Sequence, residues 1–283
     1  MNSSPDKPAS PPTSRRYTVV IPVLGQLHYT AQCVESLQAT GVASQDILVI
    51  DNASPDDTPH WLASRPELRA VTNRVNLGCG GAWAQGSFLS QSDWVVLLNN
   101  DVIAGPNAMD AMLDAADRTG LQVVSPALLE GPNDYDFAAF APAYLREMAS
   151  VVRRDWFHGV CFAVRREVFE RIGFVDTDKR LGGHEDKEFL MRCLREGVPV
   201  GTVGASVLHH FGSITQSALK RELALKALGD HHYFYRKMGY GFWGRKLLKQ
   251  RTRAQEKQWV DAERTHGGYT LHMLRKEGTW ELH

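Results

Sequence analysis

Short, almost wholly apolar segments alternate with amphipathic segments along the first third of the chain. The apolar segments are rich in Val, Ile and Leu, as is typical of strands in a parallel sheet that is covered on both faces. They are residues 17–23, 46–51 and 93–98. The segments predicted to be helical are 27–38, 58–63 and 80–89. This alternation predicts an α/β fold with a mixed, mainly parallel sheet and right-handed crossovers.

The second half of the chain has a less regular pattern. Residues 158–164 are predicted to form a further strand, and 199–204 an edge strand. Helices are expected at 166–172 and 186–195, and mainly helical structure from about residue 217 onward. Residues 127–155 mix apolar and polar positions without a clear period, so we expect a loop-rich excursion there.

These patterns divide the chain into three parts. Residues 1–15 are rich in Ser and Pro, which predicts a disordered tail. Residues 16–239 are expected to form one α/β domain with two halves, 16–126 and 127–215. Residues 240–283 are expected to form a basic helical C-terminal extension, since they carry nine Lys and Arg against five Asp and Glu.

Bulk composition excludes several classes of protein. The formal net charge is zero, which argues against a nucleic-acid-binding protein, and 43% hydrophobic residues can form a sizeable core. No apolar run approaches the roughly 20 residues of a membrane span. The four cysteines lack Cys-x-x-Cys spacing, as expected for reduced thiols in the cytoplasm. We therefore expect a cytoplasmic protein, with peripheral contact at the inner membrane face as a further hypothesis.

Polar residues or prolines stand where three of the predicted strands end. They are Pro22 with Val23 at the end of the first strand, Asp51 and Asn52 at the end of the second, and Asn99, Asn100 and Asp101 directly after the third. Ligands of open α/β sheets bind beyond the carboxyl ends of the strands. The sequence therefore predicts a ligand site at this edge, although Asp and Asn there can also simply form turns and helix caps.

A glycine-rich stretch runs from Asn76 to Ala82 and contains Gly78, Gly80 and Gly81. Glycines allow the backbone to approach a ligand, and a helix N-terminus attracts phosphate. The spacing is not that of a dinucleotide fingerprint, since Trp83 stands where the third glycine is required. A tight turn without a ligand is an equally good interpretation of this stretch alone.

Two further groups could supply metal ligands and a base. Asp101 at a strand exit offers the hard oxygen that Mg²⁺ or Mn²⁺ prefers, and His209 or His210 could add a nitrogen. Glu185 and Asp186 open a predicted helix, where one carboxylate could serve as a general base. The simpler interpretations are a helix cap for Asp101, packed histidines, and acids that complement a helix dipole.

Taken in order, these features resemble the inverting family 2 glycosyltransferases with the GT-A fold, and most closely the bacterial rhamnosyltransferase-like group that builds surface polysaccharides. The resemblance covers residues 17–239. The similar stretches are 19–25, 49–54 and 73–78 on the donor side, 98–101 at the metal motif, 158–169 on the acceptor side, 184–189 at the base motif, and 209–213 with 233–239 near the end.

The resemblance implies a metal-dependent reaction in which a sugar moves from a nucleotide diphosphate-sugar, with a dTDP- or UDP-sugar expected, to a hydroxyl acceptor such as a glycan or a lipid-linked glycan. It implies the following roles. The residues that bind the donor are Pro22, Val23, Asp51, Asn52, Asn76, Gly78, Gly80, Gly81, Asn99 and Asn100. Asp101 binds Mn²⁺ or Mg²⁺ together with His209 or His210, and the acceptor is bound by His158, Gly159, Gly183 and His184. Asp186 is the base, and Glu185 orients the acceptor or the base. One departure is Asn99, which leaves the metal motif with a single acid.

Two other functions compete with this one. A sugar-nucleotide pyrophosphorylase has a similar nucleotide-binding half, but it would need a basic, glycine-rich loop after the first strand, where residues 22–27 offer one Gly and no Lys or Arg. A non-catalytic nucleotide-sugar-binding module would not need the Glu185–Asp186 pair. Separately, residues 245–253 carry five basic and no acidic side chains, so this segment is either a solvated helix face or a contact with anionic lipid.

Overall fold

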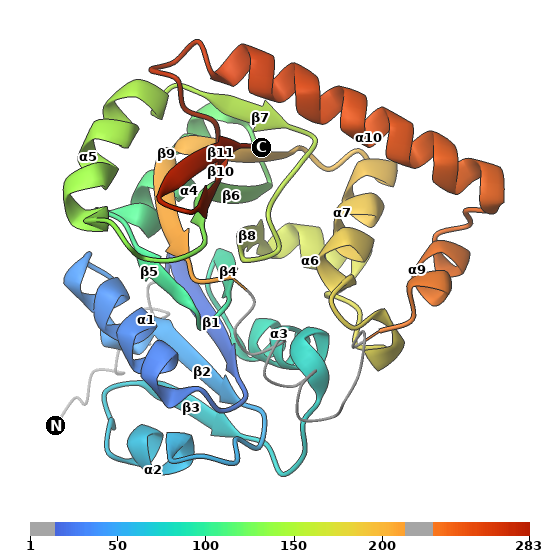
Figure 1. The fold of residues 1–283 in the computed structure, drawn as a ribbon. Coiled ribbons are helices and arrows are strands. Elements are labelled where there is room, and N and C mark those ends of the chain that lie inside the picture. The colour runs from blue at the N-terminus through green and yellow to red at the C-terminus, as the bar shows by residue number, and fades with distance from the viewer. Residues whose placement is uncertain (1–14, 213–228) are drawn as a thin grey trace, which may run out of the picture.

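The computed structural model describes residues 15–212 and 229–283. The predicted tail at 1–15 therefore lies outside the described residues except for Arg15, and so does the beginning of the region predicted to be helical from residue 217. Helices and strands alternate through the first half, as the sequence predicts (Figure 1).

The sheet is mixed, and its main path runs in the order β11-β10-β6-β8-β4-β1-β2-β3. Strands β1, β2, β3 and β4 are parallel to one another where they pair, whereas β8 is antiparallel to both β4 and β6. The strands are β1 (Tyr17–Val23), β2 (Ile47–Asp51), β3 (Arg69–Thr72), β4 (Trp94–Leu98), β5 (Val102–Ala104), β6 (Val123–Glu130), β7 (Val152–Arg154), β8 (Cys161–Arg165), β9 (Val200–His210), β10 (His272–Lys276) and β11 (Thr279–Leu282).

Helices cover both faces of this sheet, and successive residues of β1 show why its sequence is continuously apolar. Val19 and Ile21 pack with α1 and α4 in one core, whereas Val20 packs with α3, α6 and α7 in the other. Both faces of the strand are thus removed from water. The helices are α1 (Leu27–Ala39), α2 (Thr58–Ala63), α3 (Gly78–Leu89), α4 (Ala108–Thr119), α5 (Phe137–Met148), α6 (Arg166–Ile172), α7 (Glu185–Arg195), α9 (His231–Lys237) and α10 (Phe242–Glu263).

The prediction of a loop-rich excursion at 127–155 is wrong. This region contains the second half of β6 and all of α5 and β7. Pro126 obscures the strand in the sequence, and the structure accommodates it at a register shift between Pro126 and Ala127, where the ladder is already interrupted. Asp136 then begins α5 by accepting a hydrogen bond from the backbone N–H of Ala139 at 3.0 Å.

The edge strand predicted at 199–204 is also different in the structure. Strand β9 extends to His210 and pairs with β6 on one side and with β5 and β7 on the other. It is therefore an interior strand, which accounts for the burial of nearly all of its residues.

The C-terminal part contains helices, as predicted, but it ends in a β-hairpin that the sequence pattern did not predict. Helix α10 runs past α7 and α9, and the chain then returns so that β10 lies parallel to β6 (Figure 1). The hairpin turn Glu277–Gly278 has positive φ at both residues, the conformation of a type I′ turn. Among the helices in the described ranges, none is long and apolar enough to cross a membrane.

Candidate active site

A cavity of about 390 Å³ opens beyond the carboxyl ends of β4, β6 and β9. Its walls come from seven separate regions of the chain: α3, the end of β4, the end of β6, the turn before β8, the start of α7, the end of β9 and the start of β10. Nine of its polar or turn residues are Asn99, Glu130, His158, Gly159, Gly183, Glu185, Asp186, His210 and His272. The predicted base motif and one predicted metal histidine thus face the same space.

Asp101 and His210 lie together at the rim of the sheet. Strand β5, directly after Asp101, is antiparallel to β9, and this pairing brings His210 Nε2 to 3.3 Å from Asp101 Oδ1. Burial opposes protonation of His210, but the neighbouring carboxylates of Asp101 and Glu130 outweigh it and raise its pKa to about 9. Both side chains are nearly inaccessible to solvent, so the charges interact strongly.

His209 points to the opposite face of β9, because side chains alternate along a strand. Its Nδ1 lies 3.0 Å from the Tyr135 hydroxyl, and its ring contacts Phe137 and Phe211. Burial lowers the pKa of His209 to about 4, so it is neutral at pH 7. Of the two candidate histidines, the structure places His210 beside Asp101 and His209 in an aromatic cluster.

The Asp101–His210 pair fits a divalent cation that is shared with a substrate. Two adjacent ligands of an octahedral ion at about 2.1 Å lie about 3 Å apart, close to the 3.3 Å observed between these atoms. Within the described ranges there is no group of three or more His, Cys, Asp or Glu side chains arranged to hold a metal ion. The protein thus offers two ligands, and Mg²⁺ or Mn²⁺ at such sites takes the rest from phosphates and water.

Asp186 lines the same cavity as His210 and lies in the first turn of α7. A Cβ atom added to Gly159 would be 2.1 Å from Asp186 Oδ2, so only glycine leaves space for this carboxylate. Loss of solvation at the cavity wall raises the pKa of Asp186, which makes it a stronger base than a carboxylate in water. Gly159 therefore provides space for Asp186, in addition to any contact with an acceptor.

Glu185 lies next to Asp186 and is held by the backbone. Its Oε2 accepts a hydrogen bond of 2.7 Å from the N–H of Gly183, a residue with φ of 82°. Burial raises the pKa of Glu185. A Cβ on Gly80 would lie 2.2 Å from the carbonyl oxygen of Asp176 and 3.0 Å from Glu185, so the glycine-rich start of α3 packs directly against the base motif.

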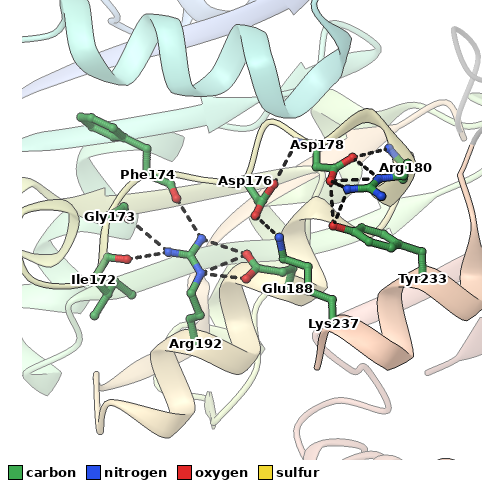
Figure 2. A network of polar contacts seen from close by, with 10 residues as sticks. All are labelled: Ile172, Gly173, Phe174, Asp176, Asp178, Arg180, Glu188, Arg192, Tyr233 and Lys237. Carbon is green, nitrogen blue, oxygen red and sulfur yellow. Dashed lines mark hydrogen bonds and ion pairs between the residues drawn. The ribbon is translucent and has the colours of Figure 1, made fainter. Parts of the chain in front are cut away.

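A polar network fixes helix α7 and hence the position of Asp186 (Figure 2). Glu188 accepts hydrogen bonds from Arg192 one turn later, and the same guanidinium donates to carbonyl oxygens of the preceding turn, 172–174. Asp176 pairs with Lys237 of α9. Backbone and side chains from three segments therefore hold the start of α7 against the cavity.

Most of the predicted donor residues lie outside the cavity walls and are engaged in shaping the neighbouring turns. Asn52 donates from Nδ2 to the carbonyl of Gly78 at 3.1 Å, and Asn76 Oδ1 accepts from the N–H of Gly78 at 2.7 Å. Asn100 is buried and donates to the Thr30 hydroxyl at 2.9 Å. These amides position the glycine turn and the β4 exit. Pro22 and Val23 end β1 beside them, and Gly81 packs on Leu77.

Asp51 differs from these amides because one of its oxygens faces no hydrogen-bond donor. Its Oδ1 accepts from the N–H of Ser54 at 2.9 Å, whereas Oδ2 is buried with no partner among the residues that the structure describes. A buried carboxylate oxygen without a donor is costly, and a ligand N–H or hydroxyl would satisfy it. This observation fits the donor role that the sequence predicts.

The two predicted acceptor histidines have different surroundings. His158 lines the cavity, and its Nε2 is buried without a hydrogen-bond partner in the described part of the chain. Burial holds its pKa well below the usual value, so His158 is neutral. His184 is turned toward α9 instead, with its ring 5.1 Å from that of Phe234. His184 therefore contributes to the junction between α7 and α9.

Several residues that line the cavity were not predicted from the sequence, among them Glu130, His272 and Trp83. Glu130 ends β6, in the region predicted to be irregular, and His272 begins β10, in the region predicted to be helical. Trp83 stands out in the sequence only as a break in the glycine pattern, yet its buried Nε1 has no hydrogen-bond partner in the described ranges. The Glu277–Gly278 turn was the available signal for the hairpin that carries His272.

Comparisons with known proteins agree with this architecture. The model of the family "Glycosyl transferase family 2" matches residues 18–173. The N-acetylglucosaminyl-diphospho-decaprenol L-rhamnosyltransferase of Mycobacterium tuberculosis is 29% identical over 236 residues, which cover 68% of this chain and 76% of that enzyme.

Solved structures of glycosyltransferases share the fold. GalNAc-T7 with UDP, GalNAc and Mn²⁺ has a TM-score of 0.56 and 15% identity, over 71% of this chain and 44% of that chain. The mannosyltransferase PcManGT from Pyrobaculum calidifontis with GDP-Man and Mn²⁺ has a TM-score of 0.52 and 21% identity, over 70% of this chain and 57% of that chain. This chain thus spans about half the length of these two proteins.

The predicted fold and function are confirmed at this level: the chain has the GT-A fold and is a rhamnosyltransferase-like glycosyltransferase. The matched region contains β1 to β8 and therefore Asp51, the glycine turn and Asp101, while the base motif and His210 lie beyond it. The chain belongs to glycosyl transferase family 2.

Proposed function

We propose that this enzyme transfers a sugar from a nucleotide diphosphate-sugar to a hydroxyl group by a single, metal-dependent displacement that inverts the anomeric configuration. One observation carries the proposal: Asp186 and His210 line one cavity, and Asp101 Oδ1 lies 3.3 Å from His210 Nε2. A general base and a cation site at one cavity are what an in-line displacement requires, because the nucleophile must attack opposite the leaving diphosphate.

Asp101 and His210 would hold Mn²⁺ or Mg²⁺, which supplies charge stabilisation for the departing diphosphate. Asp51, through its unpartnered oxygen, would accept a hydrogen bond from the base or ribose of the donor. The N-terminus of α3, which begins at Gly78, would lie near the donor phosphates and favour their negative charge. A dTDP- or UDP-sugar is the donor that we propose.

Asp186 would remove the proton from the acceptor hydroxyl, a role typically worth about 10²–10⁴ in rate. Its raised pKa, caused by loss of solvation, favours proton acceptance as the bond forms. Glu185, fixed by the Gly183 N–H, would keep the start of α7 in place and orient the acceptor. His158 has a buried ring nitrogen available for a hydroxyl of the acceptor.

A second, larger groove supports a lipid-linked glycan as the acceptor. It has a volume of about 660 Å³, lies between α7, α9 and α10, and shares Trp156, Lys187 and Leu190 with the catalytic cavity. Leu194 and Leu248 contribute apolar surface. An apolar groove that continues from the acceptor side of the cavity fits a hydrocarbon tail, and the name of the rhamnosyltransferase from M. tuberculosis specifies a diphospho-decaprenol substrate.

The beginning of α10 supports peripheral contact with an anionic membrane. Phe242 is 63% exposed and Trp243 is 76% exposed, and Lys246 lies over both rings at about 5 Å. Aromatic and basic side chains together are typical of helices that lie at a lipid interface. We therefore propose a location at the inner membrane face, with residues 245–253 toward the lipid headgroups.

The base assignment is tested with Asp186→Asn. This isosteric change should leave donor binding and the melting temperature near the wild-type values and lower kcat by about 10²–10⁴-fold. Asp261→Asn, an exposed carboxylate on α10, is the matched control and should be fully active. Turnover within about threefold of wild type in Asp186→Asn would exclude Asp186 as the base.

Two further assays separate the alternatives. A donor panel with Mn²⁺ or Mg²⁺, scored by release of nucleoside diphosphate, distinguishes a transferase from a pyrophosphorylase, which would release pyrophosphate or consume it. Donor binding without any turnover would favour the non-catalytic module. Sedimentation with liposomes that contain or lack anionic lipid tests the membrane contact, and absence of binding to both would end that proposal.

A further inference from the structure

The C-terminal hairpin forms part of the catalytic cavity. Strand β10 is parallel to β6, with His272 opposite Leu128 and Leu274 opposite Glu130. This pairing places the His272 side chain on the cavity wall beside Glu130, although the two residues are 142 positions apart in the chain. The region matched by the family model ends at residue 173, so His272 lies beyond it.

A carboxylate connects this hairpin to the proposed metal ligand. Glu130 Oε2 lies 3.1 Å from His272 Nε2, a hydrogen-bond distance, and Glu130 Oε1 lies 3.6 Å from His210 Nδ1, an ion-pair contact. On its other side, His210 Nε2 lies 3.3 Å from Asp101. The four side chains therefore form a continuous row from the β5 end of the sheet to the C-terminal hairpin.

We propose that Glu130 and His272 are positioning residues for His210: Glu130 keeps the proton of the imidazole on Nδ1, and His272 holds Glu130 in the orientation that this requires. The inference deepens the proposed function and rests on it, since it assumes that His210 Nε2 binds the divalent cation.

The physical reason lies in the two nitrogens of histidine. A neutral imidazole carries its proton on one nitrogen, and only the other nitrogen can bind a metal ion. A carboxylate beside Nδ1 favours the proton there and leaves the Nε2 lone pair for the cation. Glu130 can do so only while one of its oxygens faces His210, and the bond from His272 to the second oxygen fixes that orientation.

The hairpin does not depend on the Glu130–His272 contact for its attachment. Buried Arg153 forms two hydrogen bonds of 2.8 Å with Glu263 and one of 2.9 Å with the carbonyl oxygen of His283. The Tyr144 hydroxyl donates to the carbonyl of Thr270 at 2.8 Å. Variants at Glu130 and His272 should therefore remain folded, and this permits a test that is specific to metal binding.

The test measures the affinity of the full-length protein for Mn²⁺ alone, by electron paramagnetic resonance titration of free Mn²⁺. Glu130→Gln should weaken binding by about 10–100-fold, the usual effect of removing a partner of a ligating histidine. His272→Phe should weaken it by a smaller factor, and His272→Gln, which can still donate to Glu130, should restore it. Glu281→Gln, an exposed change in β11, is the control on the same hairpin and should bind as wild type does.

The outcomes separate this inference from the proposed function. If Asp101→Asn and His210→Gln bind Mn²⁺ as wild type does, the cation site itself is wrong, and the inference fails with it. If those two variants lose binding while Glu130→Gln and His272→Phe retain wild-type affinity, the positioning role is overturned and the cation site stands. A third outcome is that His272→Gln and His272→Phe bind Mn²⁺ equally weakly and both have a lowered melting temperature. This result would assign His272 a structural role and would also overturn the proposal.

Discussion

Replacing Glu263 with Gln should loosen the C-terminal hairpin and with it one wall of the active site. Glu263 is 4% exposed and accepts three hydrogen bonds of 2.8 Å, two from Arg153 and one from the backbone N–H of Leu271. The guanidinium of Arg153 also lies 5.0 Å from the ring of Trp259 and is itself buried. The Glu263→Gln change keeps the shape of the side chain but leaves the buried Arg153 charge without its counter-charge.

The magnitude follows from the burial of the pair. Breaking a buried ion pair by removing one partner costs about 3–5 kcal/mol, because the remaining charge is left uncompensated. The amide oxygen of Gln can still accept one or two of the three hydrogen bonds, so we expect the lower end, about 3 kcal/mol. For a chain of this size about 1 kcal/mol corresponds to about 2–4 °C in melting temperature, which gives a decrease of about 6–12 °C.

The assay is thermal unfolding at pH 7 combined with hydrogen exchange of the amides in β10. Glu35→Gln, which removes an exposed charge from α1, is the matched control and should stay within about 0.5 kcal/mol of wild type. Exchange in β10 should accelerate in Glu263→Gln and remain unchanged in β1. A melting temperature within about 1 °C of wild type, with unchanged exchange in β10, would refute the conclusion that this pair holds the hairpin.

Three further predictions concern the cavity and the helix that packs against it. In Gly159→Ala the new methyl group would overlap Asp186, so kcat should fall at least about 10-fold while the Km for the donor changes little. Steady-state kinetics would check this prediction, and a wild-type kcat would contradict it. Gly80→Ala should lower the melting temperature by several degrees, since its Cβ would lie 2.2 Å from the carbonyl oxygen of Asp176, and unaltered melting would show that α3 can shift freely. Burial lowers the pKa of His158 below 6.5, so the unfolded chain binds a proton that the folded protein does not, and stability is lost as the pH falls below about 6.5. Urea unfolding between about pH 5 and 7 should therefore give a free energy of unfolding that rises with pH less steeply in His158→Gln than in wild type, by up to about 1.4 kcal/mol per pH unit. Equal slopes in the two proteins would contradict a buried neutral His158.

The local pattern of apolar and polar residues was sufficient to predict strands that are apolar along their whole length. Strands β1, β2 and β4 are continuously apolar because both faces are covered, and the sequence places each of them within a residue of the structure. The polar ends of these strands were also visible, because a carboxylate or amide directly after a buried apolar run marks the point where the chain leaves the core. Pattern failed in β6 and in the hairpin, where Pro126 and a row of charged residues hide strands that are stabilised by distant partners.

What the sequence alone determined, then, was the α/β class, the family resemblance, and the set of acids and histidines from which a site could be built. It could not determine which of His209 and His210 faces Asp101, because the alternation of a strand says only that they point opposite ways. Nor could it join Glu130 to His272, since contacts between residues 142 positions apart arise from strand pairing across the sheet. The tertiary structure decided both, because hydrogen bonds between strands set the register, and the register sets which side chains reach the cavity.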